Sequence, residues 1–206
     1  KAVNGGDTKA VSAFAIDAAS GQMSVLDAGY LDFESRSEIL LTVEVTDKAG
    51  AASSAVVTIK VLDVNEAPVV SEDGEARTVA EGSAVGTPVG GRVVATDEDK
   101  HQTLRYELVD GNVDDAFSIH PSSGQLSVQK AASIDFEMRS GYELVVRATD
   151  NGVGGLSATG TIVVRVSNVN ESPWVSVSAG LSLVVNENSG AGVAIGTPIT
   201  GKDQDV

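Results

Sequence analysis

The chain has 206 residues, of which 42% are hydrophobic and 4% aromatic, and its 29 acidic and 14 basic residues give a formal net charge of −15 at pH 7. This composition allows a buried core, but the negative charge disfavours nucleic acid as a partner because its phosphates would be repelled. The absence of cysteine excludes disulfides, zinc bound by cysteine and thiol catalysis, and no apolar run approaches the roughly 18 residues of a membrane span.

Short segments of alternating apolar and polar residues recur along the chain. Residues 55–61 (AVVTIKV) and residues 142–148 (YELVVRA) both place apolar side chains at every second position. This period of two predicts antiparallel strands with one buried face. Glycines and clusters of Asp, Ser and Asn separate the segments, and no stretch has the pattern of a long amphipathic helix. The sequence therefore predicts an all-β fold.

A repeat of about one hundred residues organises the chain. Residues 13–37 (AFAIDAASGQMSVLDAGYLDFESRS) match residues 116–140 (AFSIHPSSGQLSVQKAASIDFEMRS), and residues 79–89 (VAEGSAVGTPV) resemble residues 185–199 (VNENSGAGVAIGTPI). Repeats of this length, made of short strands, predict tandem Ig-like Greek-key β-sandwiches. We expect a partial unit over residues 1–66 that lacks its N-terminal strands, a complete unit over residues 67–171, and a partial unit over residues 172–206 that lacks its C-terminal part.

Acidic and amide residues recur with the repeat at the expected strand ends. They lie in two linker motifs, residues 61–70 (VLDVNEAPVV) and 165–175 (RVSNVNESPWV), and in residues 79–83 (VAEGS), 95–99 (ATDED), 134–137 (IDFE) and 146–150 (VRATD). Pro68 and Pro173 keep the residue before them extended. Carboxylates that converge at a junction would repel one another, and a calcium ion with its roughly six to eight oxygen ligands would relieve that repulsion. Each motif alone is also typical of a solvated turn, because Asp and Asn favour turns.

The ordered set of motifs, xEx, DxD, LDxE, AxD and DxNxxP, resembles cadherin repeats. The versions LDFE and DVNEAP resemble the prokaryotic kind of repeat in particular. The resemblance implies cadherin-type sandwiches of seven strands, with calcium ions at the junctions between repeats that stiffen the array, and a role in adhesion.

The resemblance also implies which residues bind calcium. The first junction would use Asp32, Glu34, the Val64 and Ala67 carbonyls, Asn65, Glu66, Asp97, Asp99 and Asp150, with Asp63 binding directly or supporting the loop. The second junction would use Glu81, Asp135, Glu137, the Val169 and Ser172 carbonyls, Asn170, Glu171, Asp203 and Asp205. Glu66 and Glu171 replace the usual linker Asp of the family, and Asn168 replaces the Asp that Asp63 represents, which removes one negative charge from the second junction.

The sequence thus predicts a non-enzymatic, calcium-rigidified segment of a bacterial cell-surface or secreted adhesin that acts outside the cell. Its expected partners are calcium ions and other copies of the chain (homophilic adhesion), surface proteins or polysaccharide. A polysaccharide-binding module and a spacer within a large exported enzyme stay open as alternatives. Paired carboxylates are also the residue types of a glycosidase, but here they recur in every unit and no aromatic-lined cleft is evident. Trp174 is expected to pack at the start of the third unit's first strand, with a sugar-stacking platform as the alternative.

Overall fold

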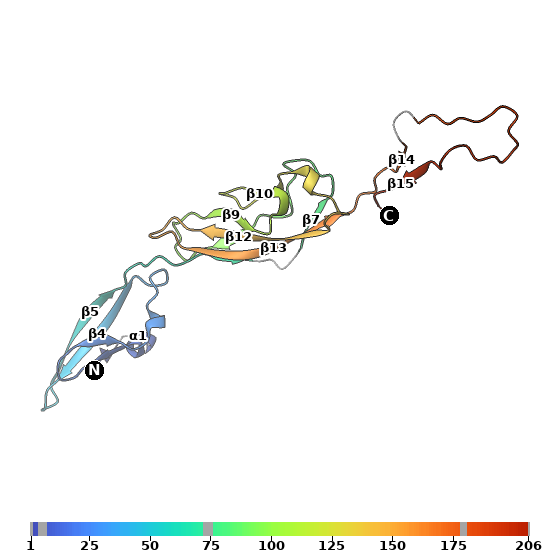
Figure 1. The fold of residues 1–206 in the computed structure, drawn as a ribbon. Coiled ribbons are helices and arrows are strands. Elements are labelled where there is room, and N and C mark those ends of the chain that lie inside the picture. Colours follow the sequence, from blue (N-terminus) through green and yellow to red (C-terminus); the bar gives the residue numbers. More distant parts are fainter. Residues whose placement is uncertain (1, 4–7, 72–75, 178–180, 206) are drawn as a thin grey trace. The chain divides into compact units, whose positions relative to one another are not determined.

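The structure is a computed structural model that describes residues 2–3, 8–71, 76–177 and 181–205, and most of its regular structure is β-strand (Figure 1). The chain divides into two compact units. Unit 1 comprises Lys1–Val69, Thr96–Leu104 and Thr149–Ser157, and unit 2 comprises Val70–Ala95, Arg105–Ala148 and Ala158–Val206. The repeat boundaries expected at residues 67 and 171 stay a prediction, because the two units group residues by contact and not by repeat.

Unit 1 contains two small sheets and a short helix. Its elements are β1 (Ala2–Val3), α1 (Thr8–Ala13), β2 (Phe14–Ile16), β3 (Met23–Val25), η1 (Ala28–Tyr30), β4 (Glu38–Thr46) and β5 (Ala52–Lys60). Strands β1, β4 and β5 form an antiparallel sheet in which Leu41 is paired with Val57, and β2 pairs antiparallel with β3. A buried cluster of Ala10, Ala13, Phe14, Ile39 and Leu41 joins helix α1 to strands β2 and β4.

Helix α1 is a feature that the sequence pattern did not predict. It has six residues, which is too short to show the periodicity of an amphipathic helix. In the second repeat the matching residues form only the 3-10 turn η2 (Val113–Asp115). Burial of Ala10 and Ala13 against the sheets accounts for the helix better than the weak propensity of so short a segment.

The larger sheet belongs mainly to unit 2. It has the order β7 (Arg77–Ala80), β13 (Ser157–Ser167), β12 (Gly141–Thr149) and β9 (Arg105–Asp110), and β13 runs parallel to β7. Strands β10 (Phe117–Ile119) and β11 (Leu126–Val128) form an antiparallel pair, and Pro88 bridges to β11. The remaining elements are β6 (Val69–Ser71), which pairs with β8 (Val94–Thr96), η3 (Ala131–Ser133), and β14 (Trp174–Ser176), which pairs with β15 (Thr200–Lys202).

The alternation predicted for residues 142–148 is confirmed on strand β12. Tyr142 and every second residue after it as far as Ala148 are buried, with at most 5% of their surface exposed, whereas Glu143 is exposed. The Phe117 ring, which is fully buried, meets the Tyr142 ring edge to face with 4.9 Å between the centroids. Removal of this apolar surface from water, worth about 25 cal/mol per Å², is the main term that holds the sheets together.

The two LDxE loops, residues 31–34 and 134–137, are supported by different aromatic residues. In the first repeat the Arg36 guanidinium lies 4.2 Å from the centroid of the Tyr30 ring in η1. In the second repeat the Arg139 guanidinium lies 5.3 Å from the centroid of the Tyr142 ring, which stands where the first repeat has the buried Ile39. The contact between an arginine and an aromatic face beside the loop is therefore kept, although the ring comes from a different element.

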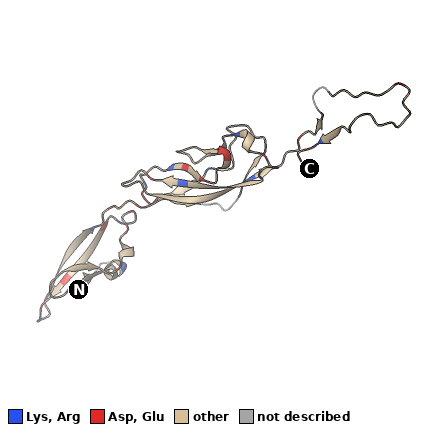
Figure 2. Ribbon diagram, in the orientation of Figure 1, with Lys and Arg blue, Asp and Glu red and all other residues tan. Residues whose placement is uncertain are grey.

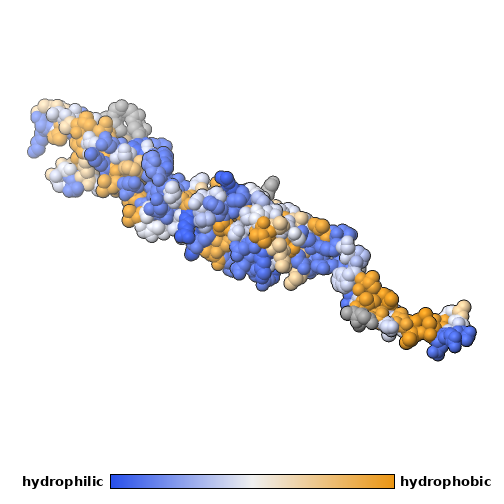
Figure 3. All heavy atoms as spheres, turned by 90° about the horizontal axis from the view of Figure 1, so that it is seen from above, coloured by the Kyte–Doolittle hydropathy of each residue, from blue (hydrophilic) through white to orange (hydrophobic). Residues whose placement is uncertain are grey.

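The segment after the second linker exposes apolar side chains. Trp174 begins β14 and is 49% exposed, and Val175 and Val184 are 61% and 90% exposed. Figure 3 shows apolar surface over this part of the chain. The expected packing of Trp174 is therefore wrong in this structure: the residue starts the strand, but half of its surface faces water.

Candidate metal centres

Each LDxE loop is a tight turn that its own aspartate stabilises. The Asp32 carboxylate accepts hydrogen bonds from the Ser35 hydroxyl (2.7 Å) and the Ser35 backbone N–H (2.9 Å), which hold the pKa of Asp32 below its usual value. In the second repeat Asp135 accepts one such bond, from the Met138 N–H at 2.8 Å. Because Met138 has no hydroxyl, the other Asp135 oxygen accepts only a long bond from Gln204 (3.4 Å).

The first acidic cluster lies within unit 1. Carboxylate oxygens of Glu34, Asp63 and Asp99 lie within 4.8 Å of one another, and Asp99 is 7% exposed. The Glu66 backbone N–H donates to Asp99 Oδ2 at 3.2 Å, and the Asp99 N–H donates to Asp97 Oδ1 at 3.0 Å. The linker and the DxD loop are therefore joined, and the structure brings these predicted site residues together.

The linker amide extends this cluster to a third loop. Asn65 Nδ2 donates to Asp150 Oδ2 at 3.2 Å, and Gln102 Nε2 donates to Asn65 Oδ1 at 2.5 Å. The other oxygen of Asp150 accepts bonds from the Gly152 and Leu156 N–H groups, so this buried carboxylate, 6% exposed, is fixed by its own loop. Sequence reasoning missed Gln102, because no motif of the repeat includes that position.

The second acidic cluster lies within unit 2 and has two overlapping groups. Glu81, Asp135 and Glu137 offer oxygens within 4.8 Å of one another, and so do Glu137, Glu171 and Asp205. Glu81, 7% exposed, accepts bonds from the Phe136 N–H (2.9 Å) and the Val169 N–H (2.5 Å). These two bonds lower the pKa of Glu81, so it stays ionised beside the other acids.

Several predicted ligands have side chains that bond elsewhere or are exposed. Asn170 Nδ2 donates to the Glu171 carbonyl at 3.1 Å, and Asp203 Oδ1 accepts from the Asp205 N–H at 3.1 Å. The side chains of Val64 and Val169 are exposed. Assignment of the Val64, Ala67, Val169 and Ser172 carbonyls to a metal therefore stays a prediction.

The acids that crowd the linkers carry uncompensated charge. Burial raises the pKa of Glu66, and so do the negative charges of Asp99, Glu34, Glu98 and Asp63. Burial likewise raises the pKa of Glu171, and so do the negative charges of Glu81 and Asp205; burial and the Glu81 charge raise the pKa of Glu137. Such shifts are typical of carboxylates that are partly buried beside other negative charges.

The residues present fit a hard cation. Among the described residues, four buried acceptor oxygens of the two clusters have no hydrogen-bond partner: Glu66 Oε2, Asp97 Oδ2, Gln102 Oε1 and Glu171 Oε2. A buried polar atom without a partner costs about 1–3 kcal/mol. Carboxylate and amide oxygens are also the ligands that calcium prefers. The donor set thus suits calcium and offers no nitrogen or sulfur ligand for a softer metal.

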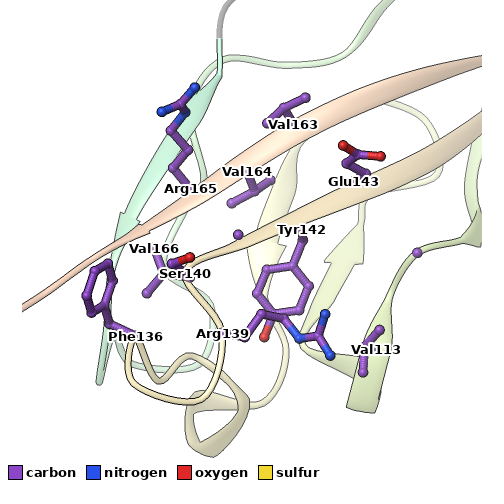
Figure 4. A pocket seen from close by; sticks show the side chains of 12 residues that line it. Val113, Phe136, Arg139, Ser140, Tyr142, Glu143, Val163, Val164, Arg165 and Val166 are labelled. Carbon is purple, nitrogen blue, oxygen red and sulfur yellow. The ribbon is translucent and has the colours of Figure 1, made fainter.

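One cavity is separate from both clusters. It has a volume of about 710 Å³ and is lined by Val113, Phe136, Arg139, Tyr142, Glu143 and neighbouring residues of β12 and β13, none of which belongs to the acidic groups. Figure 4 shows the Arg139 side chain beside the Tyr142 ring within it. Glu143 is its one lining carboxylate, so this cavity does not hold the pair of carboxylates that glycoside hydrolysis requires.

The Cadherin domain family matches residues 76–167. These residues are a cadherin domain. Human Protocadherin Fat 1 is 34% identical over 187 residues, which are 88% of this chain and 4% of that protein. Human Cadherin-related family member 2 is 32% identical over 180 residues, 85% of this chain and 14% of that protein. The chain therefore spans only a small part of the length of these curated relatives.

A solved structure supports the cadherin fold over nearly the whole chain. The crystal structure of mouse Cadherin-23 EC22-24 is similar to 93% of this chain and 61% of that chain, with a TM-score of 0.64 and 26% sequence identity. The predicted fold class, cadherin-type β-sandwiches, is confirmed. Cadherin repeats are non-enzymatic extracellular modules of cell-surface proteins, so the expectations of no enzyme activity and of an extracellular location are confirmed for this cadherin segment.

Two further findings concern the setting of the cadherin domain. The relatives named above are animal proteins, so they give no support to the specifically prokaryotic resemblance. Among the residues that the structure describes, none of the helices has the length and apolar composition needed to cross a membrane.

Proposed function

We propose that the two acidic clusters are calcium sites at the junctions between consecutive cadherin repeats, and that the chain is a calcium-stiffened segment of an adhesion protein. The observation that carries the proposal is the set of buried, unpartnered oxygens on Glu66, Asp97, Gln102 and Glu171. A bound calcium ion would supply the positive charge and the coordination that these oxygens lack. The repeat boundaries at residues 67 and 171 are part of this proposal.

The residues would act together by fixing the linkers. At the first junction, the Glu66 N–H bond to Asp99 and the Asn65 bond to Asp150 already join the linker to two loops of the following repeat. Glu34 of the preceding repeat lies in the same acidic group as Asp99. Neutralising the charge of this group removes the repulsion that would otherwise separate the loops, so the linker becomes rigid.

The experiment is a comparison of thermal unfolding with calcium and with a chelator. A ligand that binds only the folded state stabilises it by RT ln(1 + [L]/Kd), which is about 1.8 kcal/mol for 2 mM calcium and a Kd of about 0.1 mM. We expect a higher Tm in calcium than in EDTA at equal ionic strength, and a smaller effect from magnesium. Equal melting curves in calcium and EDTA would reject the calcium sites.

The wider role concerns the parent protein. We propose adhesion at a cell surface or by a secreted protein, with other copies of the chain, surface proteins or polysaccharide as partners. The motif versions LDFE and DVNEAP resemble prokaryotic repeats, and this resemblance is the basis for proposing a bacterial source. Two alternatives, a polysaccharide-binding module and a spacer in an exported enzyme, make different predictions: binding of this segment alone to a glycan array supports the first, and a catalytic domain in the same gene supports the second.

A further inference from the structure

The two acidic clusters differ at one equivalent position. Asp63 opens the first linker motif and Asn168 opens the second. In unit 1, Asp63 adds a third carboxylate to Glu34 and Asp99. In unit 2, Asn168 Nδ2 donates to Glu137 Oε1 and to Asp205 Oδ1, each at 3.1 Å.

The two positions can be compared, because a Glu, an Asp and one backbone hydrogen bond beside them correspond. Glu137 corresponds to Glu34 in the LDFE motif, and Asp205 is the second aspartate of its loop, as Asp99 is in DED. The residue after the linker asparagine donates its backbone N–H to that aspartate in both clusters: Glu66 to Asp99 Oδ2 at 3.2 Å, and Glu171 to Asp205 Oδ2 at 2.8 Å. The side chains at positions 63 and 168 therefore differ beside a Glu, an Asp and a backbone hydrogen bond that correspond, although the second cluster also contains Glu81.

The two side chains have opposite effects on their neighbours. A carboxylate at position 63 has no N–H to offer and adds negative charge to two other carboxylates. The Asn168 amide nitrogen carries two N–H groups, and its hydrogen bonds to Glu137 and Asp205 both go to carboxylate oxygens, so each is a charge-assisted hydrogen bond. A calcium ion that binds Glu137 Oε1 or Asp205 Oδ1 must compete with these hydrogen bonds. It also meets one negative charge fewer than at the first junction.

We propose that Asn168 substitutes for part of the metal at the second junction: its amide bridges Glu137 and Asp205, holds this pair together without calcium and lowers the affinity of the pair for calcium. The proposal rests on the proposed function, since it concerns the regulation of the same sites. The two junctions then differ in calcium dependence: removal of calcium disorders the first junction, whereas the Asn168 bridge keeps Glu137 and Asp205 together at the second.

The test uses three variants of the whole chain and backbone amide signals as site-specific reporters. The Glu171 N–H reports the second junction, because it is bonded to Asp205, and the Glu66 N–H reports the first, because it is bonded to Asp99. In EDTA, Asn168→Ala is expected to accelerate hydrogen exchange of the Glu171 amide about tenfold, the effect of losing about 1.4 kcal/mol of local order, and to leave the Glu66 amide unchanged.

Calcium titration provides the second measurement. Asn168→Asp is expected to tighten calcium binding at the Glu171 reporter by about tenfold, because it adds a charged ligand. The matched variant Asp63→Asn is expected to weaken calcium binding at the Glu66 reporter and to slow exchange of the Glu66 amide in EDTA. Both positions lie in linkers, and the melting curves of the three variants in EDTA show whether the fold is kept.

The outcomes separate the inference from the proposed function. An unchanged Glu171 exchange rate in Asn168→Ala, or an unchanged calcium affinity in Asn168→Asp, overturns the role of Asn168 while calcium binding by the wild-type chain stands. Absence of calcium binding at both reporters in the wild-type chain overturns the proposed function itself.

Discussion

Asn65 and Asp150 are 85 residues apart in the chain, and a hydrogen bond of 3.2 Å joins the Asn65 amide to the Asp150 carboxylate. The bond ties the first linker to the loop that follows strand β12. Asp150 can make it because its other oxygen is held by the Gly152 and Leu156 N–H groups, which fix the direction of the carboxylate. A residue in one linker is thus positioned by a loop at the far end of the following repeat's sequence.

The first prediction tests whether each cluster binds calcium independently. Asp150→Asn keeps an acceptor for the Gly152 and Leu156 N–H groups but removes the charge, so calcium affinity at the first junction is expected to fall about tenfold. Glu137→Gln is expected to do the same at the second junction only. Calcium titrations followed at the Glu66 and Glu171 amides separate the two sites.

These two variants are controls for each other. If Asp150→Asn leaves every binding step unchanged, the assignment of Asp150 as a ligand is wrong, although the fold assignment is unaffected. If either variant weakens both sites equally, the two clusters are coupled, in contrast to their placement in separate units.

A second prediction concerns Gly152, which leaves room for the linker amide. A Cβ at this position would lie 1.6 Å from Asn65 Oδ1 and 2.5 Å from the Gln102 amide. The Asn65 and Gln102 amides are the ends of flexible side chains, so Gly152→Ala is expected to displace them and to weaken calcium binding at the first junction several-fold. The expected loss of stability in EDTA is less than about 1 kcal/mol.

Gly91→Ala is the matched control, because a Cβ there has nothing within 4 Å. Calcium titration and urea unfolding in EDTA distinguish the two effects. A large loss of stability in EDTA with normal calcium affinity would mean that the backbone, and not the Asn65 side chain, yields to the new methyl group.

The repeat made most of the site predictable, because residues at equivalent positions of two repeats are expected to have the same role. Glu34, Asp99, Glu137 and Asp205 were assigned in this way, and the structure brings each of them into an acidic group. Alternation in β12 similarly identified one core face.

What the sequence did not reveal depends on contacts that lie outside the repeat pattern. Gln102 belongs to no motif, and its bond to Asn65 exists only because the fold places two loops together. The bridge made by Asn168 was visible as a missing charge, but its direction toward Glu137 and Asp205 required the geometry. Helix α1 depends on burial of two alanines, which leaves no periodic signal.

A third prediction uses the phenol of Tyr142 as a pH probe of the fold. Its hydroxyl donates to the Ser133 carbonyl, and burial raises the pKa of Tyr142 above its usual value near 10. Because the folded-state pKa is raised, the stabilising contribution is fully present below about pH 10 and is lost as the pH rises through the folded-state value.

Tyr142→Phe removes this hydrogen bond and leaves the Ser133 carbonyl without it. Stability at neutral pH is expected to fall by about 1 kcal/mol, and the steep loss of stability above about pH 10 is expected to become shallower. Urea unfolding at a series of pH values, with the ultraviolet absorbance of tyrosinate as a second signal, measures both effects. An equal alkaline loss in the variant and the wild-type chain would assign that loss to other groups.

The last prediction concerns Glu171, whose Oε2 atom is buried without a hydrogen-bond partner. Burial and the nearby charges of Glu81, Asp205 and Glu137 raise the pKa of Glu171, so its ionised form is unfavourable in the calcium-free protein. Glu171→Gln removes this charge, and the Tm in EDTA is therefore expected to rise. The same change removes a charged ligand, so calcium affinity at the second junction is expected to fall about tenfold. The higher Tm in EDTA and the weaker calcium binding both reduce the difference in Tm between calcium and EDTA.

Glu143→Gln, a change at an exposed glutamate of β12 outside the acidic groups, is the control and should leave both melting curves unchanged. A fall in the EDTA Tm of Glu171→Gln would show instead that the carboxylate stabilises the linker without a cation.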